Sequence, residues 1–407
     1  MEAMNWLWMD MNSYFASVEQ QLRPELRKQP VGVVPLDTDR TCIIAASYDA
    51  KRFGVKVGTK VYDARRLCPG IQLIKARPDV YVKMHHRLLA SVEKCAPIER
   101  IYSIDEWTIR LLGADRQLEQ ARRLAYRIKR QVAHEIGLWM SCSIGIAASR
   151  LLAKIAAGLE KPHGLTALPQ EALPERIEHL SLTKLNGVNV GIERRLNQHG
   201  VTNVRELWNL NRDEMTRAWG SISGSRWWAG LHGIDEPEPP TRRQSMSHGN
   251  VLDPQFRTAE GAHCILVKLI CKLAQRLRRS GYFANVLQLS LKDVRGGRFE
   301  TKTPIPCLQD TPSLLLQFEK LWKSRPVSNT PLLKVDVCVS DLRLASQVTR
   351  SLFQELEQPC KLSAVLDEIT DRWGPSALFF GSIHRYQHAM EEKIAFGRIP
   401  ENRSSTS

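Results

Sequence analysis

Two adjacent acidic residues, Asp105 and Glu106, lie between two apolar segments, residues 98–102 and 107–112. Both segments are typical of β-strands, whereas Asp and Glu are poor strand residues. Neighbouring carboxylates repel each other, and a hard cation such as Mg²⁺, which binds carboxylate oxygen, would relieve that repulsion. The pattern therefore predicts strand, turn or bulge, and strand. Two interpretations remain open at this point: a solvated hairpin turn or a metal site.

A third carboxylate lies near the start of the chain, inside an apolar segment. Residues 5–11 (NWLWMDM) predict a buried strand that carries a single acid, Asp10. An unpaired charge is almost never buried, so Asp10 needs a partner. It could cap the helix predicted over residues 13–22. Neighbouring strands of one sheet could instead bring Asp10 opposite Asp105 and Glu106, and such carboxylates can hold two metal ions roughly 4 Å apart.

A short helix predicted over residues 47–54 places an aromatic hydroxyl and two cations on one face. Tyr48, Lys51 and Arg52 stand at the spacing of side chains that share a helix face. Lysine and arginine are natural ligands of phosphate oxygen, so this face could clamp a triphosphate, to which Lys161 could add a third contact. A solvated basic helix face is the alternative.

The order of predicted elements up to about residue 166 indicates an α+β domain, with a mostly antiparallel sheet and helices on one face. Short helices joined by glycine-centred turns follow. Residues 185–196 resemble a helix-hairpin-helix that contains Gly187 and Gly191. In such a module backbone N–H groups hold a DNA phosphate without reading the sequence, and a plain packing unit is the alternative.

The charge of the chain points to a polyanionic partner. Its 407 residues carry a formal net charge of +15, and nucleic acid is the first candidate partner of so basic a protein. Beyond a proline-rich linker, the segment from Arg242 to Lys302 holds twelve Lys or Arg and four Asp or Glu. This surplus of positive charge lies on a second predicted α+β unit. It favours contact with a phosphate backbone, with Arg242 and Arg243 among the contacts.

Several classes of protein are disfavoured. Nine cysteines are scattered singly, without a Cys-x-x-Cys pair or a Cys/His cluster, which indicates reduced thiols and neither a disulfide frame nor a zinc site. No apolar run reaches the ~18 residues of a membrane span, and the first residues lack the features of a signal peptide. We therefore expect a soluble, cytoplasmic protein without a membrane partner.

Four sequence motifs stand out along the chain: DMNSYFASVE (residues 10–19), ASYDAKRFGV (46–55), YSIDE (102–106) and AKIAAGLEKPHG (153–164). In this order they resemble the motifs of the Y-family translesion DNA polymerases, the DinB/UmuC group. The first and third motifs look closer to the UmuC branch than to DinB. The resemblance covers residues 4 to about 345 and, more loosely, the tail.

The resemblance implies a multi-domain right-hand polymerase. Its palm would hold the mostly antiparallel sheet, its thumb the helix-hairpin-helix, and its little finger the second α+β unit. The expected bounds are residues 1–29 and 77–166 for the palm, 30–76 for the small fingers, 167–233 for the thumb, 234–243 for a linker, 244–345 for the little finger and 346–407 for a C-terminal tail.

Carried over by position, the resemblance makes Asp10, Asp105 and Glu106 the catalytic carboxylates that bind two Mg²⁺ ions, and the Met11 carbonyl would complete one metal shell. Phe15 would be the steric gate, an aromatic wall that clashes with a ribose 2′-hydroxyl. On spacing alone, Phe15 is equally an ordinary aromatic of a helix face.

The same resemblance makes Tyr48, Lys51 and Lys161 the ligands of the nucleotide triphosphate. Lys51 stands where many relatives have Arg, which replaces a bidentate fork by a point charge. Trp107 stands where a small residue is usual, directly after the acidic pair. Its large indole is expected to pack close to the primer-side metal, where it could perturb activity.

In the tail, TRSLF (residues 349–353) resembles the peptide by which bacterial proteins bind the sliding clamp. Leu352 and Phe353 would be its hydrophobic anchors. A Leu-Phe pair at the edge of a core is the alternative.

The function implied is DNA-templated DNA synthesis past damaged bases, of low fidelity, in the DNA damage (SOS) response. Its partners would be primer-template DNA, deoxynucleoside triphosphates, the sliding clamp and accessory SOS subunits, at the nucleoid. A polymerase-shaped adaptor that binds DNA and the clamp without chemistry is one alternative, disfavoured because all three carboxylates are kept. A nucleotide cyclase on a similar palm is another, but it has no use for the thumb hairpin, the basic unit or the clamp-like peptide.

Overall fold

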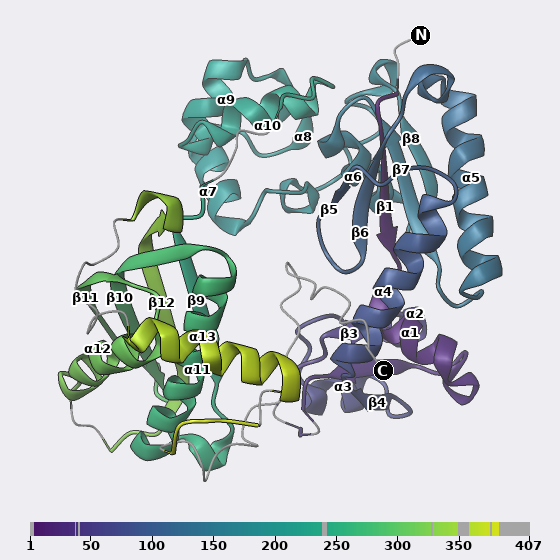
Figure 1. Cartoon of the computed structure of the whole chain (residues 1–407). Coiled ribbons are helices and arrows are strands. Elements are labelled where there is room, and N and C mark those ends of the chain that lie inside the picture. The colour runs from purple at the N-terminus through teal and green to yellow at the C-terminus, as the bar shows by residue number, and fades with distance from the viewer. Residues whose placement is uncertain are drawn as a thin grey trace. The chain divides into compact units, whose positions relative to one another are not determined.

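The computed structural model divides into two compact units, one ending at residue 237 and the other beginning at residue 242. Figure 1 labels the elements of both. No helix within the described ranges is long and apolar enough to cross a membrane. The described residues are 4–36, 38–39, 41–237, 242–326, 329–348, 358–374 and 377–381.

A five-stranded sheet, in the order β5-β6-β1-β7-β8, forms the centre of the first unit. The middle strand β1 (Trp6–Met11) pairs antiparallel with β6 (Glu106–Arg110) and β7 (Cys142–Ala147). At the edges, β5 (Arg100–Ile101) pairs antiparallel with β6, and β8 (Leu165–Leu168) pairs parallel with β7. The prediction of a mostly antiparallel sheet is confirmed. The near-continuous apolar run of β1 follows from its central position, because both of its faces are covered.

Each face of β1 packs into its own core. Leu7 belongs to a core with α4 (Pro78–Glu93) and α5 (Leu118–Glu135), whereas Trp8 belongs to a core with α6 (Arg150–Leu159). Figure 1 shows α5 and α6 on opposite sides of the sheet. The prediction of helices on one face only is therefore wrong. Helix α6 directly follows β7 and folds back over the second face.

A separate three-stranded sheet, in the order β3-β2-β4, lies in the same unit. Its central strand pairs antiparallel with β3 and parallel with β4. Three helices accompany it, close to the predicted positions. The elements are α1 (Tyr14–Leu22), β2 (Val31–Val34), β3 (Ala45–Ala46), α2 (Tyr48–Arg52), α3 (Val61–Leu67) and β4 (Gln72–Lys75).

Short helices complete the first unit after β8, and residues 185–196, which resemble a helix-hairpin-helix in sequence, lie among them. Gly187 has φ +96°, which only glycine adopts without strain, and the Trp227 indole N–H donates to the Asn186 carbonyl beside it at 2.9 Å. Asn189 then caps the next helix by accepting the Ile192 N–H at 2.9 Å. The helices are α7 (Val190–Gln198), α8 (Val204–Asn209), α9 (Arg212–Trp219) and α10 (Ser223–Leu231).

The second unit is an antiparallel four-stranded sheet, in the order β11-β10-β12-β9, that shares one core with two helices. The sequence predicts helices over residues 258–280 and 313–323 and the two inner strands over 286–291 and 333–342, but it misses β9 and β11. Both missed strands are sheet edges, and β11 contains two prolines, which edge strands tolerate. The elements are β9 (Ser245–Val251), α11 (Ala259–Arg279), β10 (Tyr282–Asp293), β11 (Arg298–Leu308), α12 (Thr311–Lys323) and β12 (Leu332–Leu344).

A further helix, α13 (Gln358–Trp373), docks on the second unit, where the sequence predicts a helix over residues 362–373. The buried Ser363 hydroxyl accepts the Thr311 N–H at 3.0 Å. The Arg278 guanidinium donates to both oxygens of Asp367, at 2.7 and 2.8 Å. At least one of the basic side chains that the sequence suggested for DNA contact is thus neutralised within the unit.

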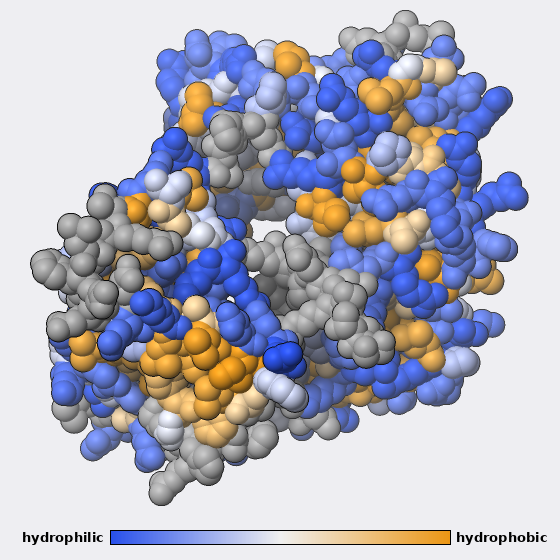
Figure 2. Space-filling view, viewed as in Figure 1, coloured by the Kyte–Doolittle hydropathy of each residue, from blue (hydrophilic) through white to orange (hydrophobic). Residues whose placement is uncertain are grey.

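Part of the outward surface of α13 is apolar. Figure 2 shows apolar side chains gathered on the second unit where Figure 1 places α13. Leu362, Val365 and Trp373 each expose half or more of their surface. The helix therefore docks partly through polar side chains and leaves part of its apolar surface to solvent.

Close packing of β7 against α6 depends on Gly145. A Cβ atom at this position would lie 2.0 Å from the Ala153 carbonyl oxygen and 2.3 Å from the Ala157 nitrogen. We expect Gly145→Ala to push α6 off the sheet and to lower the free energy of unfolding by about 2 kcal/mol. Urea unfolding followed by tryptophan fluorescence measures this loss.

Gly158→Ala on the same helix is the matched control. Nothing lies within 4 Å of a Cβ atom there. Because alanine favours a helix over glycine by up to ~1 kcal/mol, this variant should be neutral or slightly stabilised. Equal losses in the two variants would contradict the packing argument.

Candidate active site

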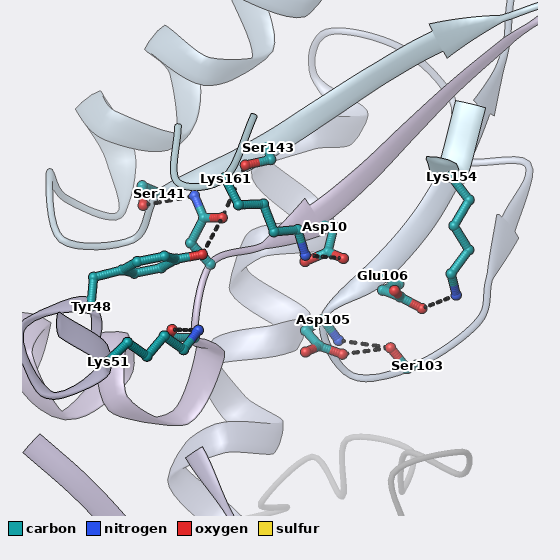
Figure 3. Close-up of polar contacts among 12 residues, drawn as sticks. Asp10, Tyr48, Lys51, Ser103, Asp105, Glu106, Ser141, Ser143, Lys154 and Lys161 are labelled. Atoms are coloured by element: carbon teal, nitrogen blue, oxygen red, sulfur yellow. Dashed lines mark hydrogen bonds and ion pairs between the residues drawn. The ribbon is translucent and has the colours of Figure 1, made fainter. Parts of the chain in front are cut away.

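Three carboxylates gather at one end of β1. Asp10 lies opposite Glu106 in the pairing of β1 with β6, and the Met11 N–H donates to the Asp105 carbonyl at 2.9 Å. Figure 3 shows the three acidic side chains in one region beside the ends of these strands. The prediction that Asp10 lies opposite the acidic pair is confirmed. Their binding of metal stays a prediction.

Two lysines neutralise two of these carboxylates (Figure 3). Lys161 Nζ lies 2.6 Å from Asp10 Oδ2, and Lys154 Nζ lies 2.9 Å from Glu106 Oε2. Lys129 of α5 fixes the turn after α6 by donating to two of its carbonyls, at 2.5 and 2.9 Å. The sequence reasoning missed Lys154. The available signal was its place in the motif AKIAAGLEKPHG, which also contains Lys161.

Burial raises the pKa of two of the carboxyl groups. The pKa of Asp10 is raised to about 6, mainly by burial, while Lys161 lowers it and the charges of Glu106 and Asp105 raise it further. Burial also raises the pKa of Asp105, although a hydrogen bond of 2.5 Å from the Ser103 hydroxyl lowers it. Crowded, partly desolvated carboxylates of this kind favour a cation beside them.

The three carboxylates offer only oxygen atoms as metal ligands, and oxygen suits a hard divalent cation. Within the described part of the chain, however, no three His, Cys, Asp or Glu side chains form a ready metal-binding group. In the described structure the carboxylates of Asp10 and Glu106 contact lysines, and that of Asp105 contacts a serine hydroxyl. The residue types fit a metal site, and their present contacts compensate their charge by other means.

A cavity of about 230 Å³ lies beside Asp10. Its lining includes all four side chains that the sequence suggested for nucleotide binding: Phe15, Tyr48, Lys51 and Lys161. They come from α1, α2 and the turn after α6, three segments that are far apart in the sequence. The structure therefore brings the carboxylates and the suggested phosphate ligands to one place.

Tyr48 and Lys51 are tied to the chain that leaves β1. The Tyr48 hydroxyl donates to Asn12 Oδ1 at 3.5 Å, and Lys51 Nζ donates to Ser13 Oγ at 2.7 Å. Buried Asn12 also accepts the Ser143 hydroxyl at 3.0 Å, so it connects β7 to α2; the sequence reasoning missed this connection. Burial lowers the pKa of Lys51 and raises that of Tyr48 to about 12, which keeps the Tyr48 hydroxyl protonated as a donor.

Trp107 lies on the opposite face of the sheet from Glu106. Successive side chains of a strand alternate, and Trp107 pairs with Met9 in the core beneath α4. Its indole is fully buried and lies edge-on to His85, with ring centroids 5.9 Å apart. The His85 Nδ1–H donates to the Ile104 carbonyl at 2.7 Å, and burial lowers the His85 pKa to about 4. Trp107 thus packs in the core on the face away from Glu106, and its effect on activity stays a prediction.

The remaining predicted residues lie elsewhere. Gly187 and Gly191 lie at or just before the start of α7. Arg242 and Arg243 belong to the second unit, where Arg243 Nη1 donates to the Ser280 hydroxyl at 3.3 Å. The clamp-like peptide, residues 349–353 with Leu352 and Phe353, lies outside the described residues.

Comparison with known proteins identifies the family. A model of the impB/mucB/samB family matches residues 9–158, and a model of the C-terminal domain of that family matches residues 243–352. A DNA polymerase IV of Moorella thermoacetica is 30% identical over 373 residues, 90% of this chain and 92% of that protein. A DNA polymerase IV of Pelotomaculum thermopropionicum is 29% identical over 383 residues, 91% of this chain and 92% of that protein.

Among solved structures, a Y-family DNA polymerase chimera, Dbh-Dpo4(243-245)-Dbh, is similar with a TM-score of 0.70. It is 19% identical, and the match covers 84% of this chain and 100% of the chimera. At this identity the likeness shows the fold, which agrees with the right-hand architecture expected from the sequence. The two family models and the Moorella relative show more: the chain belongs to the impB/mucB/samB family, the Y family of translesion DNA polymerases.

Proposed function

We propose that this polymerase joins deoxynucleotides to a primer by a two-metal reaction centred on Asp10, Asp105 and Glu106. Family membership makes the chain a DNA-directed DNA polymerase of translesion synthesis that acts on template DNA and nucleotides and uses divalent metal. One observation supports this site above all others: the carboxylates at the end of β1 lie beside a cavity lined by Tyr48, Lys51 and Lys161. The relatives are polymerases, which leaves the adaptor and cyclase alternatives without support.

The three carboxylates and the Met11 carbonyl would hold two Mg²⁺ ions. Their oxygen-only chemistry supports this assignment, and so does the pKa of Asp10, which burial raises although Lys161 lowers it. When bound, such ions lower the pKa of the primer hydroxyl and neutralise charge on the triphosphate.

Tyr48, Lys51 and Lys161 hold the triphosphate in this proposal. The two lysines supply point charges for phosphate oxygen, and the protonated Tyr48 hydroxyl supplies a hydrogen bond. Phe15 lines the same cavity as the steric gate. Because Lys161 already contacts Asp10, it lies at the boundary between the carboxylates and the triphosphate clamp.

Contacts outside this site complete the proposal. Backbone N–H groups near Gly187 and Gly191, together with Arg242 and Arg243, contact DNA phosphates. Leu352 and Phe353 bind the sliding clamp, and accessory SOS subunits assist at the nucleoid, as the motifs of the UmuC type suggest. The palm is residues 1–29 and 77–166, the fingers 30–76, the thumb 167–233, the linker 234–243, the little finger 244–345 and the tail 346–407.

Removing one carboxylate tests the metal site. We expect Asp105→Ala to lower primer extension about a thousandfold, because several kcal/mol of charge stabilisation are lost. Extension is measured with Mg²⁺ on an undamaged and an abasic template, and DNA affinity by fluorescence anisotropy should stay within about twofold. Ser103→Ala is the control, since it removes only the hydrogen bond to Asp105. Extension by Asp105→Ala at the wild-type rate would refute the assignment.

Shortening the gate tests Phe15. We expect Phe15→Ala to admit ribonucleotides, because the wall that meets the 2′-hydroxyl is gone. The ratio of deoxynucleotide to ribonucleotide insertion efficiency should fall about a hundredfold. Single-nucleotide insertion with the two substrates measures it, and an unchanged ratio would remove Phe15 as the gate.

Replacing the two anchors tests the clamp peptide. We expect Leu352→Ala with Phe353→Ala to reduce synthesis stimulated by the clamp, because these side chains would fill its pocket. Synthesis without the clamp should not change. Loss of both activities would point to a role in folding instead.

A further inference from the structure

The wall formed by Phe15 has a second aromatic ring directly behind it. The Phe15 side chain, 4% exposed, stacks on Tyr81 of α4, with ring centroids 4.4 Å apart and planes inclined by 15°. Tyr81 is fully buried. A push on Phe15 along the stacking direction is therefore transmitted to Tyr81.

Polar contacts fix Tyr81 at both ends. Its backbone carbonyl accepts the Tyr14 hydroxyl at 2.8 Å, and its own hydroxyl donates to Glu19 Oε1 at 2.8 Å. The first contact holds the α4 backbone against α1. The second holds the tip of the ring, so that the ring resists both sliding and tilting.

Glu19 is the anchor of this assembly. It stands four residues after Phe15 on α1, on the same face of the helix. Its side chain is fully buried, and Arg77 donates to both of its oxygens, from Nε at 3.0 Å and from Nη2 at 2.6 Å. A bidentate pair of this kind has a strict geometry. Arg77 directly precedes α4, so the ion pair also ties α4 to α1.

We propose that the ion pair between buried Glu19 and partly exposed Arg77 is a positioning element for sugar selection, which holds Tyr81 against the back of Phe15 so that the gate does not yield to a ribose 2′-hydroxyl. The inference rests on the proposed role of Phe15. The Phe15 ring excludes a ribose 2′-hydroxyl only as long as displacing the ring costs free energy. Displacements well below 1 Å decide such contacts. Glu19 and Arg77 are not among the residues that line the nucleotide cavity, so they act on the sugar through Tyr81 and Phe15.

Arg77→Gln tests the ion pair. We expect the ratio of deoxynucleotide to ribonucleotide insertion efficiency to fall about tenfold, while deoxynucleotide insertion itself changes less than about threefold. Arg23→Gln is the matched control. Arg23 contacts the same carboxylate at 3.6 Å only, and its side chain is 35% exposed against 33% for Arg77. It should leave the ratio unchanged. Circular dichroism establishes that each variant folds.

Tyr81→Phe covers the case in which Arg77→Gln does not fold. It removes one hydroxyl and keeps the stacked ring, so the ratio should fall in the same direction. An unchanged ratio in a folded Arg77→Gln variant, or in Tyr81→Phe when Arg77→Gln does not fold, would overturn the proposal. A fall of equal size in Arg23→Gln would do the same, since it would show a general effect of charge.

A double variant separates this inference from the gate itself. If Arg77 acts through Phe15, Arg77→Gln should lower the ratio no further once Phe15→Ala is present. An additional tenfold fall would show that Arg77 acts by another route. An unchanged ratio in Phe15→Ala alone would refute the gate and, with it, this inference. If the ratio falls in Phe15→Ala but does not change in the folded Arg77→Gln and Tyr81→Phe variants, the role of the Glu19–Arg77 ion pair is refuted and the role of Phe15 is kept.

Discussion

Negative charge held at the end of β1 is the constraint on which the structure around it depends. A buried carboxylate persists only with a cation or hydrogen bonds to compensate it. The two cations closest to it come from α6 and the turn that follows, Lys154 and Lys161. Helix α6 can supply them only because Gly145 lets it approach the sheet closely, and Lys129 fixes the turn. Strand β1, helix α6 and the turn after α6 are thus arranged around one cluster of carboxylates.

The sequence was most informative where the evidence was local. Strand alternation and the motifs predicted that Asp10 would lie opposite Glu106, and the register agrees. The suggested phosphate ligands Tyr48, Lys51 and Lys161 also line one cavity. What the sequence could not show was which distant side chains complete the site. The contact between Tyr81 and Glu19 joins positions 62 residues apart, and nothing in either local segment marks the other as its partner.

Other differences have simple physical reasons. The sequence reasoning did not say on which face of the sheet Trp107 packs. Neighbours in a strand face opposite sides, so the alternation rule would have placed Trp107 on the face away from Glu106. Edge strand β11 was missed because its exposed, proline-containing sequence lacks the apolar alternation of a half-buried strand. The helix over residues 149–158 was predicted, but its place on the second face of the sheet was missed. Both faces of β1 are apolar, and such a run does not tell which element covers which side.

Helix α13 neutralises positive charge on the second unit. Arg278 and Arg279, both at the end of α11, make ion pairs with Asp367 and Asp371 of α13. A chain shortened at residue 348 would uncover both guanidinium groups at once. Because each cation that contacts a phosphate releases counterions, such a shortened polymerase would hold any polyanion more tightly and with a steeper dependence on salt. Stronger retention on DNA after truncation would then report a lost intramolecular counter-charge and would carry no information about clamp binding.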